Sequence, residues 1–124
     1  MKASILLVED DPDVLALARR WLEREGYAVA HAADGNAALA ALGQGALPDL
    51  VLLDVMLPKV DGFAVLTRIR ADARTRALPV IMVTSFTRDK DVARGRELGA
   101  NDYIVKPLAE VDFLERVGRI FKKA

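Results

Sequence analysis

Acidic, hydroxyl and ammonium side chains follow four separate apolar stretches of this sequence. Glu9 and Asp10 come directly after the first stretch, and Asp54 closes the stretch Asp-Leu-Val-Leu-Leu-Asp. Thr84 ends a third stretch and Lys106 follows a fourth. Short, continuous apolar runs are typical of strands in a parallel sheet that is covered on both faces. Ligands bind at the carboxyl ends of such strands, so we expect these polar side chains to gather at one edge.

The carboxylates need a positive partner if they meet there. Neighbouring strands lie about 4.8 Å apart, which would bring Asp10 and Asp54 within several ångströms of each other. Two unit charges about 5 Å apart repel by roughly 3 kcal/mol at an effective dielectric constant of about 20. Lys106 can offset part of this repulsion, and a hard divalent cation such as Mg²⁺ can offset the rest. We expect Glu9, Asp10, Asp54 and the backbone carbonyl of Met56 to hold that cation.

The same groups suit phosphoryl transfer to a carboxylate oxygen. The cation and Lys106 would neutralise charge on the equatorial phosphoryl oxygens, and the Thr84 hydroxyl would donate a hydrogen bond to one of them. Asp54 is the candidate nucleophile, because it ends the most apolar of the expected strands and a loop follows it directly.

The composition fits one globular domain and excludes several kinds of site. The chain has 124 residues, of which 52% are hydrophobic and 29% are charged, with a formal net charge of zero. It lacks the basic excess that is usual in nucleic-acid binders. It contains no cysteine, and its one histidine, His31, cannot build a multi-histidine metal site. No apolar run approaches the roughly 18 residues that cross a membrane, so we expect a soluble cytoplasmic domain.

Strand and helix patterns alternate along the chain. Strands are expected at Ala3–Val8, Tyr27–Ala32, Asp49–Asp54, Leu78–Val83 and Tyr103–Val105. Helices are expected from Pro12 to just before Gly26, with Asp11 as N-cap, and at Asn36–Leu42, Asp61–Ala71, Arg88–Leu98 and Glu110–Phe121. This alternation predicts an α/β fold of the (βα)5 type, a doubly wound five-stranded parallel sheet with helices on both faces. Five strands fit the flavodoxin-like order 2-1-3-4-5, which is taken from known folds and not from these residues.

Four segments resemble the receiver domain of two-component response regulators, with chemotaxis regulators as similar members. They are Ile5–Asp11, Asp49–Pro58 leading to Asp61–Gly62, Pro79–Ser85 and Gly99–Pro107. Four such segments in order, at the ends of expected strands, make the resemblance specific, and it covers essentially the whole chain. It implies one receiver domain over residues 1–124 that acts as a phosphorylation-activated switch in a phosphorelay.

The resemblance implies a role for each site residue. Asp54 would accept a phosphoryl group from a phosphohistidine of a sensor histidine kinase or a histidine phosphotransfer protein. Glu9 and Asp10 would form the acidic pair that holds Mg²⁺, Asp10 directly and Glu9 through water. Thr84 and Lys106 would contact the phosphoryl oxygens.

Further positions acquire roles from the resemblance. Tyr103 would be the switch aromatic, which turns inward when Thr84 moves toward the phosphoryl group. The Lys106–Pro107 bond resembles the family's cis peptide, which would aim the ammonium inward. Met56 and Phe86 stand where the family tunes hydrolysis of the phosphoaspartate. Our hypothesis is that apolar groups there lengthen the signal, because attacking water finds no hydrogen-bonding partner.

The expected partners are the phosphodonor protein and either a downstream effector protein or an output domain outside this chain. A homodimer through the helix Arg88–Leu98, the strand Tyr103–Val105 and the helix Glu110–Phe121 is a further expectation. We expect no direct binding to nucleic acid or to a membrane. The chain would catalyse only its own phosphorylation and slow dephosphorylation. The sequence leaves open whether it is a stand-alone regulator or one domain of a longer one.

Three other functions can be weighed against this one. A flavin or nucleotide binder would need N–H groups and hydroxyls after the first strand, where this chain has three acids. A Mg²⁺-dependent phosphatase with an aspartyl-phosphate intermediate typically has a second Asp two residues after the nucleophile, where Met56 stands. A phosphorylation-independent pseudo-receiver would act only as an interaction module, but the complete set of acids with Thr84 and Lys106 argues against it.

Overall fold

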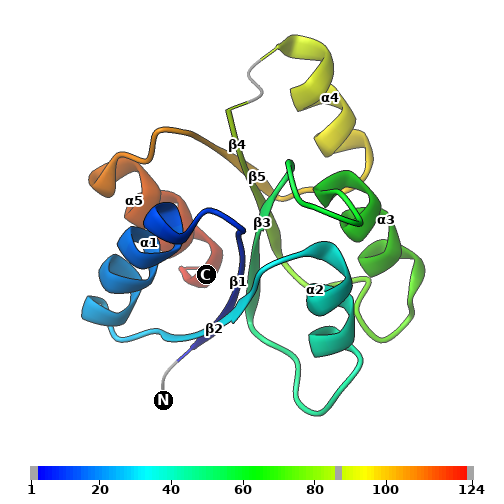
Figure 1. Ribbon diagram of the computed structural model, residues 1–124, viewed down its shortest axis with the longest axis horizontal. Coiled ribbons are helices and arrows are strands. Elements are labelled where there is room, and N and C mark those ends of the chain that lie inside the picture. Colours follow the sequence, from blue (N-terminus) through cyan, green and yellow to red (C-terminus); the bar gives the residue numbers. More distant parts are fainter. Residues whose placement is uncertain (1–2, 86–87, 123–124) are drawn as a thin grey trace.

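The structure is a computed structural model that describes residues 3–85 and 88–122. Its strands are β1 Ser4–Val8, β2 Ala28–Ala32, β3 Leu50–Asp54, β4 Val80–Thr84 and β5 Asp102–Val105. Its helices are α1 Pro12–Arg24, α2 Gly35–Leu42, α3 Gly62–Ala71, α4 Asp89–Glu97 and α5 Glu110–Phe121. Figure 1 shows α1 and α5 on one face of the sheet and α2, α3 and α4 on the other. The predicted α/β architecture is confirmed.

All five strands form one parallel sheet in the order β2-β1-β3-β4-β5. The order matches the flavodoxin-like expectation. Val8 of β1 pairs with Leu53 of β3. The residues that follow them, Glu9 and Asp54, therefore lie side by side at the carboxyl ends of these two strands. Asp54 in turn pairs with Val83 of β4, which places Thr84 one residue beyond it. The register therefore brings three of the expected site residues to one edge.

The side chains of β3 alternate between two cores. Val51 and Leu53 join the cluster beneath α2 and α3, whereas Leu50 and Leu52 join the cluster beneath α1 and α5. Every residue of β3 is buried, as predicted for a strand covered on both faces. Among the described residues, no helix is long and apolar enough to cross a membrane.

Aspartates begin three of the helices. The carboxylate of Asp11 accepts hydrogen bonds from two backbone N–H groups of α1, which confirms its predicted role as N-cap. Asp34 and Asp61 cap α2 and α3 in the same way. The cap at Asp34 explains why α2 begins at Gly35, one residue before the predicted start.

Strand boundaries differ from the prediction by one or two residues. β1, β2 and β3 each begin one residue later than predicted, at Ser4, Ala28 and Leu50. β4 begins at Val80 and not at Leu78, because the Leu78 N–H donates to the carbonyl of Thr75 and closes the turn after α3. β4 also extends to Thr84, one residue past the predicted end. β5 begins at Asp102, one residue earlier than predicted, where it pairs with Ile81.

Candidate functional site

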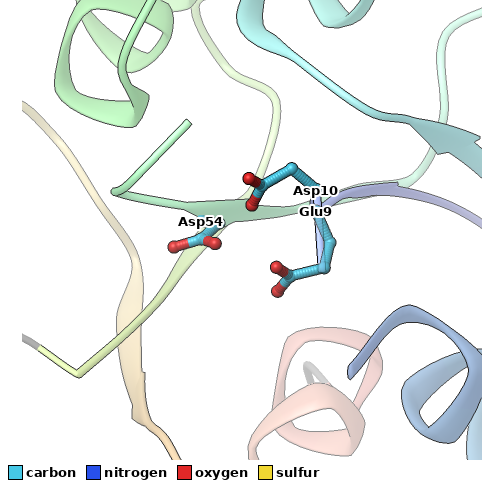
Figure 2. A group of neighbouring side chains, drawn as sticks. All are labelled: Glu9, Asp10 and Asp54. Carbon is cyan, nitrogen blue, oxygen red and sulfur yellow. The ribbon is translucent and has the colours of Figure 1, made fainter. Parts of the chain in front are cut away.

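Three carboxylates meet at the ends of β1 and β3. Glu9, Asp10 and Asp54 each offer an oxygen, and these oxygens all lie within 4.8 Å of one another. Figure 2 shows the carboxylates of Glu9 and Asp10 reaching toward Asp54 from the end of β1. Glu9 and Asp54 are buried, at 2% and 3% exposure, whereas Asp10 is exposed. The structure thus places together the three acidic residues that the sequence analysis selected.

Lys106 supplies a positive charge to this cluster from the end of β5. Its Nζ lies 3.0 Å from Oδ2 of Asp54 and 2.9 Å from Oε1 of Glu9. The bond between Lys106 and Pro107 is cis, as the resemblance implied. The sequence analysis expected Lys106 to offset charge, but it did not identify Glu9 as a direct partner. Only the tertiary structure, in which Lys106 after β5 reaches Glu9 after β1, reveals that contact.

One ammonium does not neutralise the cluster fully. Burial raises the pKa of Glu9 to about 7, the hydrogen bond from Lys106 opposes this increase, and the charge of Asp54 adds to it. Burial alone would lower the pKa of Lys106, but its hydrogen bonds to Glu9 and Asp54 outweigh burial and raise it. The lysine is therefore held as an ammonium, and the site retains excess negative charge at neutral pH.

The loop after β3 fixes the Asp54 carboxylate from the other side. The backbone N–H of Met56 donates to Oδ1 of Asp54 at 3.1 Å, while the Met56 side chain is exposed. The N–H of Gly62 donates to the carbonyl of Val55 and draws the start of α3 against the strand end. A Cβ built at Gly62 would lie 2.2 Å from the Asp54 carbonyl oxygen. Gly62 thus permits a close approach that no other residue type allows.

Thr84 and Tyr103 lie on the two strands beyond Asp54. Thr84 is buried at the end of β4, and its carbonyl accepts a hydrogen bond from the Lys106 N–H at 3.0 Å. Tyr103 is 8% exposed, and its hydroxyl donates to the backbone carbonyl of Asp91 in α4 at 3.1 Å. The ring therefore lies in the core on the α4 side of the sheet. Our prediction for Phe86 concerns a residue outside those that the structure describes.

His31 approaches the site although the sequence analysis gave it no role. Its Nε2 lies 3.0 Å from the backbone carbonyl oxygen of Glu9. The residue lies on β2, where it pairs with Leu7 of β1. The contact fixes the backbone at Glu9 but places no imidazole nitrogen on the carboxylates. No pattern in the sequence indicates this contact, because it depends on the pairing of β2 with β1.

The donor set fits a hard divalent cation. Two buried carboxylates and one exposed carboxylate supply the oxygen ligands and the negative charge that Mg²⁺ prefers. The exposed position of Asp10 leaves room for the water molecules that Mg²⁺ retains. Chemically, a buried carboxylate beside an ammonium and a strand-end hydroxyl can take up a phosphoryl group and stabilise its charge.

Comparison with known proteins agrees with this geometry. Residues 5–118 match the family model described as the response regulator receiver domain. The transcriptional regulator RpaA of Synechocystis is 43% identical over 96% of this chain and 49% of its own length. The response regulator PleD of Caulobacter vibrioides is 40% identical over 94% of this chain and 26% of its own length. The chain thus spans about half or less of the length of these relatives.

Solved structures show the same fold over the whole chain. A response regulator from Chloroflexus aurantiacus has a TM-score of 0.93 and 34% identity, with 99% of this chain and 100% of that one covered. The chemotaxis response regulator CheY4 of Vibrio cholerae has a TM-score of 0.90 and 30% identity, with 97% and 99% covered. With the strand order, the acidic cluster and the family match in agreement, the chain belongs to the receiver domains of two-component response regulators.

Proposed function

We propose that this receiver domain is switched by phosphorylation of Asp54 in a Mg²⁺-dependent reaction. The observation that carries the proposal is the buried Asp54 carboxylate, which shares a 4.8 Å cluster with Glu9 and Asp10 and binds the Lys106 ammonium. The three other functions considered above are not favoured by the family match. The family match covers residues 5–118, and we propose that the receiver domain spans all of residues 1–124.

The donor we propose is a phosphohistidine of a sensor histidine kinase or a histidine phosphotransfer protein. An Asp54 carboxylate oxygen attacks phosphorus, the P–O bond forms and the P–N bond breaks. The electron pair of the broken bond stays on the imidazole nitrogen, which takes up a proton. The products are an aspartyl phosphate and a neutral histidine.

The residues around Asp54 position and stabilise the phosphoryl group. Lys106, already 3.0 Å from Asp54, would pair with a phosphoryl oxygen, and the Thr84 hydroxyl would donate to another. Bound Mg²⁺ would supply further positive charge to these oxygens. Asp10 and Asp54 are the proposed direct ligands together with the Met56 carbonyl, and Glu9 acts through water because it is buried against Lys106.

We propose a switch and not a turnover enzyme. Met56 stands two residues after Asp54, where a phosphatase of this chemistry would carry its acid–base carboxylate. The chain would then catalyse only its own phosphorylation and a slow loss of the phosphoryl group. Phosphorylation would shift the population between two states that differ around Thr84 and Tyr103.

The partners follow from this role. Receiver domains interact with histidine kinases and with effector proteins or output domains, and we propose both classes for this chain. A homodimer through α4, β5 and α5, a lack of direct nucleic-acid and membrane contacts, and a cytoplasmic location stay predictions from the sequence.

One experiment tests the proposed function directly. The wild type and Asp54→Asn are incubated with acetyl phosphate and Mg²⁺, and each is analysed by intact mass. We expect one acid-labile phosphoryl group on the wild type and none on Asp54→Asn. Asp49→Asn is the matched control, because Asp49 lies just before the opposite end of β3 and bonds to Ser4. Absence of labelling in the wild type would identify a pseudo-receiver, and sustained phosphate release at catalytic rates would identify a phosphatase.

A further inference from the structure

Tyr103 is held by α4 at two points. Its ring lies in the core cluster beneath α2, α3 and α4, with Val92 and Leu98 packed against that cluster. Its hydroxyl donates to the carbonyl oxygen of Asp91, in the first turn of α4, at 3.1 Å. The ring and the hydroxyl of one β5 residue are thus both fixed by the same helix. Figure 1 shows α4 beside the ends of β4 and β5.

Gly95 makes the space for this ring. A Cβ built at Gly95 would lie 2.6 Å from Cε2 and 3.2 Å from the hydroxyl oxygen of Tyr103. The ring is 8% exposed and packed in a core, so it cannot move away from an added side chain without leaving that core. A side chain at position 95 and the inward position of Tyr103 are therefore incompatible.

The backbone conformation at position 95 does not require glycine. Gly95 lies inside α4 and is not among the glycines with a positive φ. Glycine inside a helix is less favourable than alanine, because it loses more conformational freedom on folding. The benefit at this position is thus the contact with Tyr103, gained at a cost in helix propensity.

The contact connects α4 to the acidic site. Tyr103 lies in β5, and Lys106 follows it by only three residues, just after the strand ends. Lys106 in turn binds Asp54 and Glu9. We propose that Gly95 is a positioning residue, whose missing side chain seats the Tyr103 ring against α4 and thereby joins α4 to the strand that precedes Lys106. This inference goes beyond the proposed function and does not depend on it.

The contact is tested by the direction in which one substitution changes the rate of amide hydrogen exchange in α4. If Gly95 were only a helix residue, Gly95→Ala would slow amide hydrogen exchange in α4 a few-fold, because alanine favours the helix. If Gly95 seats Tyr103, the added methyl expels the ring, and exchange in α4 accelerates by about tenfold. Gly118→Ala in α5 is the control, since a Cβ there meets no atom of the described residues within 4 Å outside its own helix backbone. Slower exchange in both variants would overturn the proposal.

A second variant distinguishes a specific clash between position 95 and Tyr103 from a general loss of stability. In a Tyr103→Leu background the ring is absent, so Gly95→Ala should now slow exchange in α4, as Gly118→Ala does in α5. The same acceleration in both backgrounds would show that the methyl clashes with something other than Tyr103, and the proposal would fail.

Tyrosine ionisation reports the ring directly. The chain has two tyrosines, so Tyr27→Phe leaves Tyr103 as the single one. Burial raises the pKa of Tyr103 above its ordinary value, and the charge of Asp91 adds to this. In the Tyr27→Phe background, Gly95→Ala should return the midpoint of tyrosinate absorbance to about 10. An unchanged, raised midpoint would mean that the ring stays inward without its seat.

Labelling with acetyl phosphate and Mg²⁺ separates this contact from the proposed function. A wild type that takes up no phosphoryl group would count against the proposed function, and the exchange and ionisation results would still decide the contact.

Discussion

Lys106 reaches from the end of β5 to the end of β3, where its Nζ lies 3.0 Å from Oδ2 of Asp54. The same ammonium contacts Glu9, so one positive charge serves two buried carboxyl groups, and the exposed Asp10 adds a third carboxyl group beside them. The site therefore has more carboxylates than ammonium groups, an imbalance that a divalent cation would offset.

Removing the ammonium should destabilise the chain in the absence of divalent cations. Lys106→Met leaves the buried Glu9 and Asp54 without a positive partner, and we expect a loss of about 3 kcal/mol in the free energy of unfolding. Mg²⁺ should restore part of this loss, because it supplies the missing charge. Urea unfolding with EDTA and with Mg²⁺ measures both effects. Lys90→Met, at an exposed position of α4, is the control and should change little. Equal stability of the two variants would contradict the role of the shared ammonium.

Glu9 should make the stability of the metal-free chain depend on pH. Its pKa is about 7 in the folded chain, above the ordinary value of 4.5, so the folded state binds more protons between these values. The free energy of unfolding should therefore be highest at the acidic end of this window and fall as the pH rises through 7. The loss is on the order of 3 kcal/mol.

Glu9→Gln should remove this pH dependence, since glutamine does not titrate. Urea unfolding with EDTA at a series of pH values compares the variant with the wild type, and Glu25→Gln, at an exposed position, serves as the control. Parallel curves for Glu9→Gln and the wild type would show that Glu9 is not the group responsible.

The close approach at Gly62 should be essential for the site. A Cβ at this position would meet the Asp54 carbonyl oxygen at 2.2 Å and Cα of Val55 at 2.7 Å. Both are backbone atoms, so the strand end itself must move, and we expect Gly62→Ala to cost about 3 kcal/mol and to slow labelling of Asp54. Gly118→Ala should be neutral or slightly stabilising. Thermal unfolding and intact mass after acetyl phosphate treatment measure the two effects, and labelling at the wild-type rate would refute the second.

Met56 should lengthen the life of the phosphoaspartate. Its side chain is 58% exposed beside Asp54 and offers water no strong hydrogen-bonding partner. We expect Met56→Glu to accelerate loss of the phosphoryl group by about tenfold, because a carboxylate can orient and activate the attacking water. Met56→Leu is the control and should leave the rate unchanged. The measurement is the decay of the phosphorylated mass after removal of the donor, and identical decay in all three proteins would reject the hypothesis.

The sequence by itself determined the sheet, the helices and the membership of the acidic cluster. Continuous apolar runs such as Leu50–Asp54 predict buried parallel strands, and their ends predict where Asp54 and Thr84 lie. The resemblance added the strand order, the cis bond before Pro107 and the roles of the site residues. These features depend on local patterns or on residue types at fixed spacing, so they can be predicted from a single sequence.

Only the tertiary structure decided how the groups contact one another. The sharing of Lys106 between Glu9 and Asp54, the Gly62 approach and the Gly95 seat for Tyr103 join residues that lie far apart along the chain or on different elements. The same holds for the hydrogen bond from the Tyr103 hydroxyl to the backbone carbonyl of Asp91. Such contacts depend on side-chain packing between elements, and periodicity in the sequence specifies which face is buried but not which atoms meet there.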